Sequence, residues 1–237
     1  MLKLVQFHPA FGVRNMSPFC LKLETWLRMS GIEYEVVWNS STRDAPKGRL
    51  PYIEDGDLRL GDSSLIIDYL ISQHGDRLDS WLDVRQHAQA LAWRTLFEEG
   101  LIYPILYSRW IDPAGWQLTQ QLFDPLPPPK RQIIADSQRE SVRQRLDGQG
   151  MGRHSAKEIY HLGSRYLSAI EAQLGEQPFM LGAQPSALDA TAYGFLANLL
   201  DTPFENPLNQ QASATPRFSA YVMQMKKRYF SEPAQAQ

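Results

Sequence analysis

Residues 17–38 read SPFCLKLETWLRMSGIEYEVVW and predict a helix followed by a strand. Ser17 is a preferred N-cap residue, and Pro18 suits the first helical position because its missing N–H needs no partner there. Gly31 can adopt the left-handed conformation that often ends a helix. Residues 34–38 are β-branched and aromatic, as strands prefer. We therefore expect a helix from Pro18 up to Gly31 and a strand after it.

Strand signals surround this helix on both sides. Residues 1–7 are rich in β-forming side chains and stop at His8-Pro9, and residues 52–54 predict a further short strand. Asp55-Gly56 is a hairpin dipeptide, so residues 58–61 should pair with the preceding strand. Helical spacing of apolar residues then runs from 62 to 74. The order of strand, helix, strand, hairpin and helix predicts a thioredoxin-like domain with a mixed four-stranded sheet, whose first two strands are parallel.

The remainder of the chain predicts helices. A polar segment at 77–83 reads as a linker, and the Ser186/Asp189 pair has the spacing of a capping box. Pro104 should kink the first of these helices or end it early. The fold class is thus α/β plus all-α, with a thioredoxin-like domain at 1–78 and an all-helical domain at 84–237. The predicted helices span 84–110, 116–123, 130–146, 155–174, 188–200 and 217–230.

Composition narrows the classes of function. The 237 residues include 24 basic and 26 acidic side chains, so the net charge of -2 does not favour nucleic acid or anionic membranes as partners. Cys20 is the only cysteine, which excludes an intramolecular disulfide and suits a reducing cytoplasm. The N-terminus lacks the apolar run of a signal peptide, and no stretch of about 18 apolar residues predicts a membrane span.

Three segments carry a resemblance to a known family, namely Ser-Pro-Phe-Cys at 17–20, Lys-Gly-Arg-Leu-Pro-Tyr at 47–52 and Asp-Ser-Ser-Leu-Ile at 62–66. Together they resemble the N-terminal domain of the glutathione transferase superfamily. Residues 188–200, with their capping box, resemble the core helix of the family's C-terminal domain. The resemblance implies a cytoplasmic enzyme that uses glutathione as co-substrate, without a metal, for attack on a small hydrophobic electrophile. It also implies a homodimer.

Ser17 and Cys20 are the two candidate catalytic residues. A free thiol is mostly protonated at neutral pH, so glutathione must be activated. A helix N-terminus carries partial positive charge, and the Ser17 hydroxyl could donate a hydrogen bond to the thiolate there. Alternatively, Ser17 only caps the helix. Cys20, one turn further, is either a redox nucleophile or a small buried apolar residue.

Five residues are candidates for binding glutathione. By resemblance, Leu50-Pro51 is a cis peptide whose leucine offers its backbone to the cysteinyl part. Asp62 and Ser63 resemble the pair that holds the γ-glutamyl end, although both could instead be helix-capping residues. Arg49, with Lys47 nearby, could pair with the glycyl carboxylate or remain a solvated loop charge.

Two other functions compete with glutathione conjugation. The run SPFCLKLETWLRM at 17–29 resembles the superfamily branch that contains metaxins and failed-axon-connections proteins, several of which are not known for transferase activity. A non-catalytic binding or interaction protein is therefore one alternative. Glutathione-dependent thiol reduction through Cys20 is the other.

Overall fold

The computed structural model describes residues 1–231, and their packing forms two compact units. Unit 1 contains Met1–Arg94, Leu174–Thr202 and residues 216–231, whereas unit 2 contains Thr95–Gln173 and Pro203–Thr215. This division is by packing and is discontinuous along the chain. The boundary between domains that we place at 78–84 stays a prediction.

A four-stranded sheet forms one layer of unit 1. Its strands are β1 (Leu2–Gln6), β2 (Tyr34–Trp38), β3 (Tyr52–Asp55) and β4 (Leu58–Gly61), in the order β2-β1-β3-β4. Strand β1 pairs with β2 in parallel and with β3 antiparallel, and β3 pairs antiparallel with β4. The predicted mixed sheet and its parallel first pair are confirmed.

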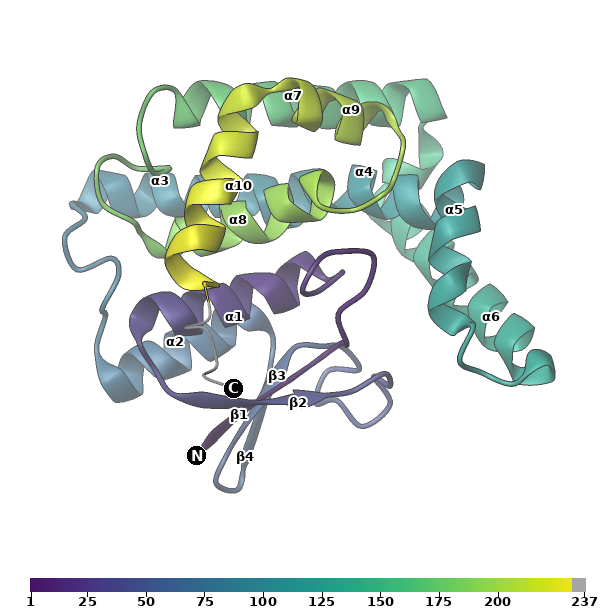
Figure 1. Ribbon diagram of the computed structural model, residues 1–237, viewed down its shortest axis with the longest axis horizontal. Helices are drawn as coiled ribbons and strands as arrows, with labels where there is room; N and C mark the ends of the chain where they lie inside the picture. Colours follow the sequence, from purple (N-terminus) through teal and green to yellow (C-terminus); the bar gives the residue numbers. More distant parts are fainter. Residues whose placement is uncertain (232–237) are drawn as a thin grey trace. The chain divides into compact units, whose positions relative to one another are not determined.

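Helices α1 (Pro18–Ser30) and α2 (Ser63–His74) lie over one face of this sheet (Figure 1). Gly31 ends α1 in the left-handed conformation with φ 62°, as its position after the apolar run predicts. The helices and the sheet share one buried cluster. Its members include Leu4 and Ile53 from the sheet, Leu23, Trp26 and Leu27 from α1, and Ile66, Ile67 and Leu70 from α2.

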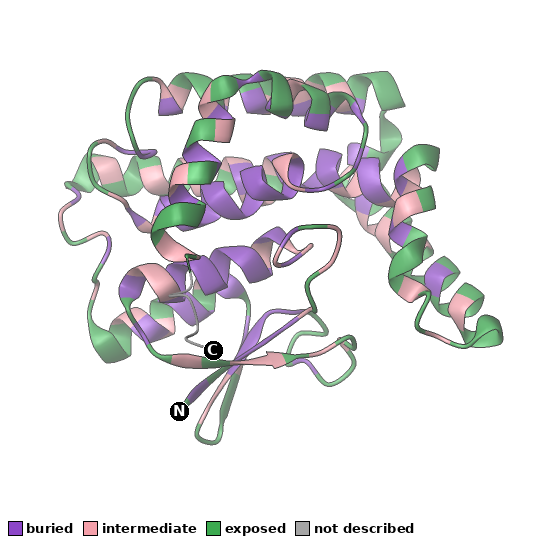
Figure 2. Ribbon diagram, in the orientation of Figure 1, coloured by how far each residue is buried: buried purple, intermediate pink, exposed green. Residues whose placement is uncertain are grey.

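Helix α8 (Ala187–Leu200) packs on α1 and is the most buried helix of unit 1, as the colouring of Figure 2 shows. Residues 188–199 are all buried, which agrees with a sequence that is apolar on nearly every side. The predicted capping box is present, since Asp189 accepts hydrogen bonds from the Ser186 backbone and hydroxyl. Gly194 permits close helix packing, because an added Cβ would lie 2.7 Å from the Pro18 carbonyl oxygen.

Two further helices complete unit 1. Helix α10 (Pro216–Tyr229) ends in Lys226, Lys227 and Arg228, which suit the negative end of the helix dipole. Tyr221 of α10 donates a hydrogen bond of 2.9 Å to the Asp189 carboxylate. Helix α3 (Val84–Thr95) follows the segment at 77–83. In that segment the Asp79 carboxylate accepts a hydrogen bond of 2.7 Å from the Ala187 backbone N–H. The predicted linker thus carries a cap for α8.

Unit 2 is helical throughout its secondary structure. It contains the π-helical segment η1 (Leu96–Leu101), α4 (Ile102–Leu106), the π-helical segment η2 (Tyr107–Ile111), α5 (Pro113–Thr119), the 3-10 segment η3 (Gln120–Phe123), α6 (Pro128–Gln149), the 3-10 segment η4 (Met151–Arg153), α7 (Ala156–Leu174) and α9 (Pro207–Ala214). Only the last residue of α7 belongs to unit 1. Helix α9, which Asn206 caps through its side chain, escaped the sequence analysis although Asn-Pro is a helix-start signal.

Pro104 does not end its helix early, contrary to one of our two expectations. The proline lies inside α4, with a π-helical segment before it and another after it. A π-helical turn widens the helix and accommodates the interrupted hydrogen-bond ladder. Helical structure consequently continues to Ile111, where Asp112 caps the next helix.

Replacement of Gly194 by alanine should destabilise the protein by about 2 kcal/mol, because overpacking of this kind costs roughly 1–3 kcal/mol. Gly148 of α6 is the matched control, since an added Cβ there meets nothing within 4 Å. Gly148→Ala should leave stability unchanged or raise it by about 0.5–1 kcal/mol. Urea unfolding of both variants measures the difference; equal stability of the two would contradict the close α1–α8 packing.

Candidate functional site

The candidate site lies at one end of the sheet. Val5 pairs with Tyr52, and Tyr52 pairs with Gly61. The end of β1, the start of β3 and the end of β4 therefore share this end, which brings Pro51 beside Asp62. The loop after β1 also leads from here to the start of α1. Chain topology thus gathers most of the residues that the sequence singled out.

Ser17 caps α1 and is held in place by a buried asparagine. The Ser17 hydroxyl accepts a hydrogen bond of 3.3 Å from the Cys20 N–H, and its side chain is partly exposed. Its own N–H donates to the Asn15 amide oxygen at 3.0 Å. Asn15 in turn donates to the Phe7 carbonyl at 2.8 Å. Ser17 is therefore fixed to the end of β1, with its hydroxyl at the positive end of α1.

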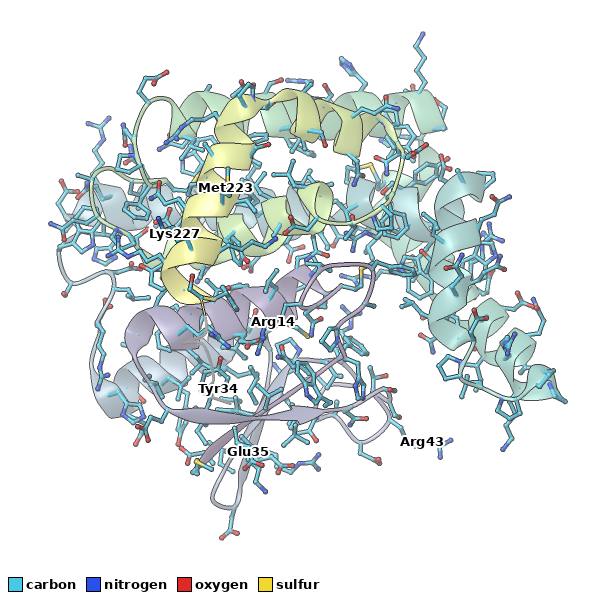
Figure 3. The ribbon with its side chains drawn as sticks, viewed as in Figure 1. Arg14, Tyr34, Glu35, Arg43, Met223 and Lys227 are labelled. Carbon is cyan, nitrogen blue, oxygen red and sulfur yellow. The ribbon has the colours of Figure 1, made fainter. Side chains whose placement is uncertain are left out.

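A buried charge network supports this loop. Glu24 is fully buried, and its carboxylate accepts from Gln6 at 2.7 Å and from Arg14 at 2.6 Å. Arg28 and Tyr34 contact the same carboxylate at 3.3 Å and 3.1 Å. Figure 3 labels Arg14 on the loop before α1 and Tyr34 on β2. Removing one partner from such a buried charge costs roughly 3–5 kcal/mol, so the network anchors the loop that carries Ser17.

Cys20 is fully buried, in a cluster with Val5, Ala45, Leu50 and Tyr52. Burial raises the pKa of its thiol to about 12, against the weaker opposite effects of the Ser17 hydroxyl and the Phe7 backbone. A thiol with this pKa is neutral at physiological pH and is a poor nucleophile. The geometry thus favours the buried apolar role for Cys20.

The Leu50–Pro51 peptide bond is cis, as the resemblance implies. Leu50 is buried at 7% exposure, and it belongs to the same apolar cluster as Cys20. Pro51 immediately precedes β3. Leu50 therefore packs in the cluster that includes Cys20 of the first turn of α1, and Pro51 leads directly into β3.

Asp62 and Ser63 begin helix α2. Asp62 is the N-cap, and its carboxylate accepts from the backbones of Ser64 at 3.0 Å and Leu65 at 3.2 Å. Its φ of 86° lies in a region that non-glycine residues rarely occupy, and such strain is concentrated at functional sites. Ser63 is the first residue of α2 and is 4% exposed. The capping role is present, and a helix start of this kind can also bind an anion.

Arg49 and Lys47 lie in the exposed loop before the cis proline. Lys47 is beside the end of β4, because an added Cβ at Gly61 would lie 3.6 Å from its side chain. Lys47 is thereby close to the start of α2. Arg49 is exposed, which fits both a contact with the glycyl carboxylate and a solvated loop charge.

Sequence reasoning missed three buried polar residues that shape this site, namely Lys22, Glu24 and Asn15. Lys22 is 1% exposed, and its ammonium donates to the Ser64 hydroxyl at 2.9 Å. The available signal was the pair of charges at 22 and 24, which lie among apolar residues in the first half of the helix. Charged residues are almost never fully buried without a partner, so charges in a helix that is buried on all sides indicate a network.

Neither a metal centre nor a membrane span is evident in the described part of the chain. Among residues 1–231, no group of three or more histidine, cysteine, aspartate or glutamate side chains could hold a metal ion. Over the same residues, no helix combines the length and apolar character that crossing a membrane requires.

The fold is a thioredoxin-like domain joined to helices, and comparison with known proteins identifies the family. Residues 18–115 match the model of the glutathione S-transferase N-terminal domain, and residues 163–225 match that of the C-terminal domain. The chain belongs to the glutathione S-transferase family.

The similar proteins include one that is named as a glutathione S-transferase and two that are not. The isoprene-epoxide–glutathione S-transferase of Rhodococcus sp. strain AD45 is 32% identical over 97% of this chain and 99% of its own length. Failed axon connections of Drosophila melanogaster is 31% identical over 98% of the chain, which spans only 59% of that protein. Human metaxin-2 is 24% identical, with 90% of this chain and 82% of its own length covered.

Solved structures agree on the fold. The β-etherase LigF of Sphingobium sp. strain SYK-6 superposes with a TM-score of 0.67 at 17% identity, covering 98% of this chain and 99% of that one. A glutathione S-transferase of Methylobacterium radiotolerans, solved with glutathione sulfonate, has a TM-score of 0.62 at 15% identity, with 96% and 91% covered. The predicted combination of a thioredoxin-like sheet domain and helices is confirmed.

Proposed function

We propose that this protein is a glutathione transferase in which Ser17 activates the thiol of glutathione for attack on a small hydrophobic electrophile. The observation that carries the proposal is the placement of the Ser17 hydroxyl at the N-terminus of α1, at the sheet end that also holds Pro51 and Asp62. Glutathione is the co-substrate, and no step requires a metal. The backbone of Leu50 would meet its cysteinyl part, Ser63 its γ-glutamyl end and Arg49 its glycyl carboxylate.

The chemistry follows from the charge at the helix start. The N-terminus of α1 attracts negative charge, and a hydroxyl donor stabilises a thiolate further. Each unit by which the pKa of the thiol falls needs about 1.4 kcal/mol and raises the thiolate fraction about tenfold near neutral pH. The thiolate sulfur then forms a bond to an electrophilic carbon. With an epoxide the carbon–oxygen bond breaks, and the oxygen takes a proton from water.

An epoxide is the substrate class that we propose. The reason is the relative from Rhodococcus, whose name assigns isoprene epoxide to that enzyme and which matches this chain over nearly its whole length. The chain's single cysteine also suits a reducing compartment, so we propose the cytoplasm as its location.

A binding or interaction protein is the second candidate. The similarity to metaxin-2 and to failed axon connections favours it. Such a protein would keep the buried network around Glu24, which anchors the loop, without requiring turnover. Catalysis, in contrast, requires the Ser17 hydroxyl itself, so the two candidates differ in what a substitution at position 17 does.

Replacement of Ser17 by alanine should lower kcat/KM for conjugation of glutathione to a small 1,2-epoxide about 10- to 100-fold, because one thiolate hydrogen bond is lost. Cys20→Ala is the matched control and should retain activity, since the buried thiol is neutral. Product formation by mass spectrometry measures both rates.

Three outcomes of this experiment would count against conjugation through Ser17. Absence of glutathione binding to the wild type at millimolar concentration rejects the proposal. Binding without turnover favours the interaction protein. Activity that survives Ser17→Ala but disappears in Cys20→Ala, with a mixed disulfide on Cys20, favours the thiol reductase.

We further propose a homodimer that pairs through α3. Among the residues described for this helix none is buried, and Val84 and Leu91 are 89% and 55% exposed. Val84, Ala88 and Leu91 have the spacing of one helix face. An exposed apolar helix face is typical of an interface.

Replacement of Leu91 by aspartate should convert a dimer into a monomer in light scattering, because it introduces a charge into an apolar contact. Met223 of α10, labelled in Figure 3, is the matched control because it is 66% exposed. Met223→Asp should leave the dimer intact. A monomeric wild type, or dissociation by both substitutions alike, would contradict pairing through α3.

A further inference from the structure

Asn198 is a fully buried polar residue in the last turn of α8, a helix whose buried side chains are mostly apolar. Its amide nitrogen donates a hydrogen bond of 3.0 Å to the Gly194 carbonyl of its own helix. The same nitrogen donates to the Asn15 carbonyl, also at 3.0 Å. Asparagine is a poorer helix former than leucine, so local preference does not explain its presence here.

The Asn15 carbonyl belongs to the loop that carries Ser17. Asn15 is itself fully buried, and its side chain accepts a hydrogen bond of 3.0 Å from the Ser17 N–H. The same side chain donates to the Phe7 carbonyl at 2.8 Å, at the end of β1. One residue, Asn15, therefore links the Asn198 amide to the N-cap of α1.

Helix α8 meets this loop at a second point. Gly12 has a φ of 83°, and an added Cβ there would lie 3.0 Å from the carbonyl oxygen of Asp201, the C-cap of α8. The end of α8 thus contacts the loop at Gly12 and at Asn15, while the Glu24 carboxylate of α1 binds Arg14 between them. A loop held at three positions within four residues has little freedom to move.

Ionisable side chains lie near this loop and the sheet end beside it. Arg14 pairs with Glu24 at 2.6 Å, and Lys226 pairs with Asp201 at 2.9 Å. Burial raises the pKa of the Cys20 thiol to about 12, so this group is neutral. Exposed ionisable side chains at the same end of the sheet include His8, Lys47, Arg49 and Asp62. A substitution of Asn198 alters the charge of none of them.

We propose that Asn198 is a positioning residue that sets the Ser17 hydroxyl for its hydrogen bond to the glutathione thiolate. Its amide holds the main chain of Asn15, and the Asn15 side chain holds the main chain of Ser17. Because hydrogen bonds weaken steeply when their angle is poor, a displacement of Ser17 weakens its bond to the thiolate. The inference rests on the proposed glutathione function and deepens it by giving α8 a part in thiol activation.

The pH dependence of glutathione affinity tests the proposal. If the bound thiol has a pKa about one unit below the value of roughly 8.5 for a free thiol, the affinity rises about tenfold between about pH 5.5 and pH 9.5. The rise occurs because the thiolate then binds more tightly than the thiol. Calorimetry should show it for the wild type. S-methylglutathione has no ionisable thiol, so it reports the pH dependence that comes from other groups.

Replacement of Asn198 by serine should reduce the rise for glutathione to about threefold or less. A serine within a helix can still donate to the carbonyl four residues earlier, here that of Gly194, but it is too short to keep the bond to Asn15. Asn198→Leu is a second variant, which removes both donors and suits the apolar surroundings. Both variants should bind S-methylglutathione as tightly as the wild type does.

Thr202→Val is the matched control at the same end of α8. The Thr202 hydroxyl donates to the Asn198 carbonyl at 2.8 Å, and the residue is 8% exposed. The substitution therefore removes a buried hydrogen bond that does not join α8 to the loop. Glutathione affinity in this variant should keep the tenfold rise.

The proposal is overturned if both Asn198 variants keep the full rise in glutathione affinity. It is also overturned if they weaken S-methylglutathione binding as much as glutathione binding, or if Thr202→Val reduces the rise equally, since each result indicates a merely structural role. All three results leave the proposed function standing, because the wild type still shows the rise. A wild type whose affinity for glutathione rises no more than its affinity for S-methylglutathione overturns both.

Discussion

Helix α8 crosses α1 so closely that a methyl group at Gly194 would lie 2.7 Å from the Pro18 carbonyl. This contact buries α1 on the side away from the sheet, while the sheet and α2 bury the other. A helix enclosed in this way cannot shift to relieve strain, because protein interiors are close-packed. The first turn of α1, which carries Ser17, is consequently held at a fixed place at the end of the sheet.

Much of unit 1 follows from the sequence because its signals are local. Ser17-Pro18 and Gly31 predict the ends of α1, and Asp55-Gly56 predicts the hairpin, since each depends on backbone preferences of single residues. Contacts between particular side chains far apart in the sequence were not predicted. The contact of Lys22 with Ser64 and that of Gln6 with Glu24 join elements whose approach is known only once the sheet is assembled. The early helix end that Pro104 suggested does not occur, because flanking π-helical turns accommodate the proline.

The candidate site consists largely of residues that also satisfy the ends of helices. Ser17, Asp62 and the capping box of α8 all satisfy helix ends, so their presence alone does not distinguish an enzyme from a binding protein. The backbone of Asp62, with its φ of 86°, costs stability instead. Backbone strain of this kind is concentrated at functional sites.

Ultraviolet titration of glutathione bound to the protein would measure whether a thiolate forms at the start of α1. The thiolate absorbs where the thiol does not, so its fraction can be followed against pH in the complex. Activation by Ser17 should lower the pKa of the bound thiol at least about one unit below the value of roughly 8.5 for a free thiol, and the pKa should return towards that value in Ser17→Ala. An unshifted pKa in the wild-type complex would contradict it.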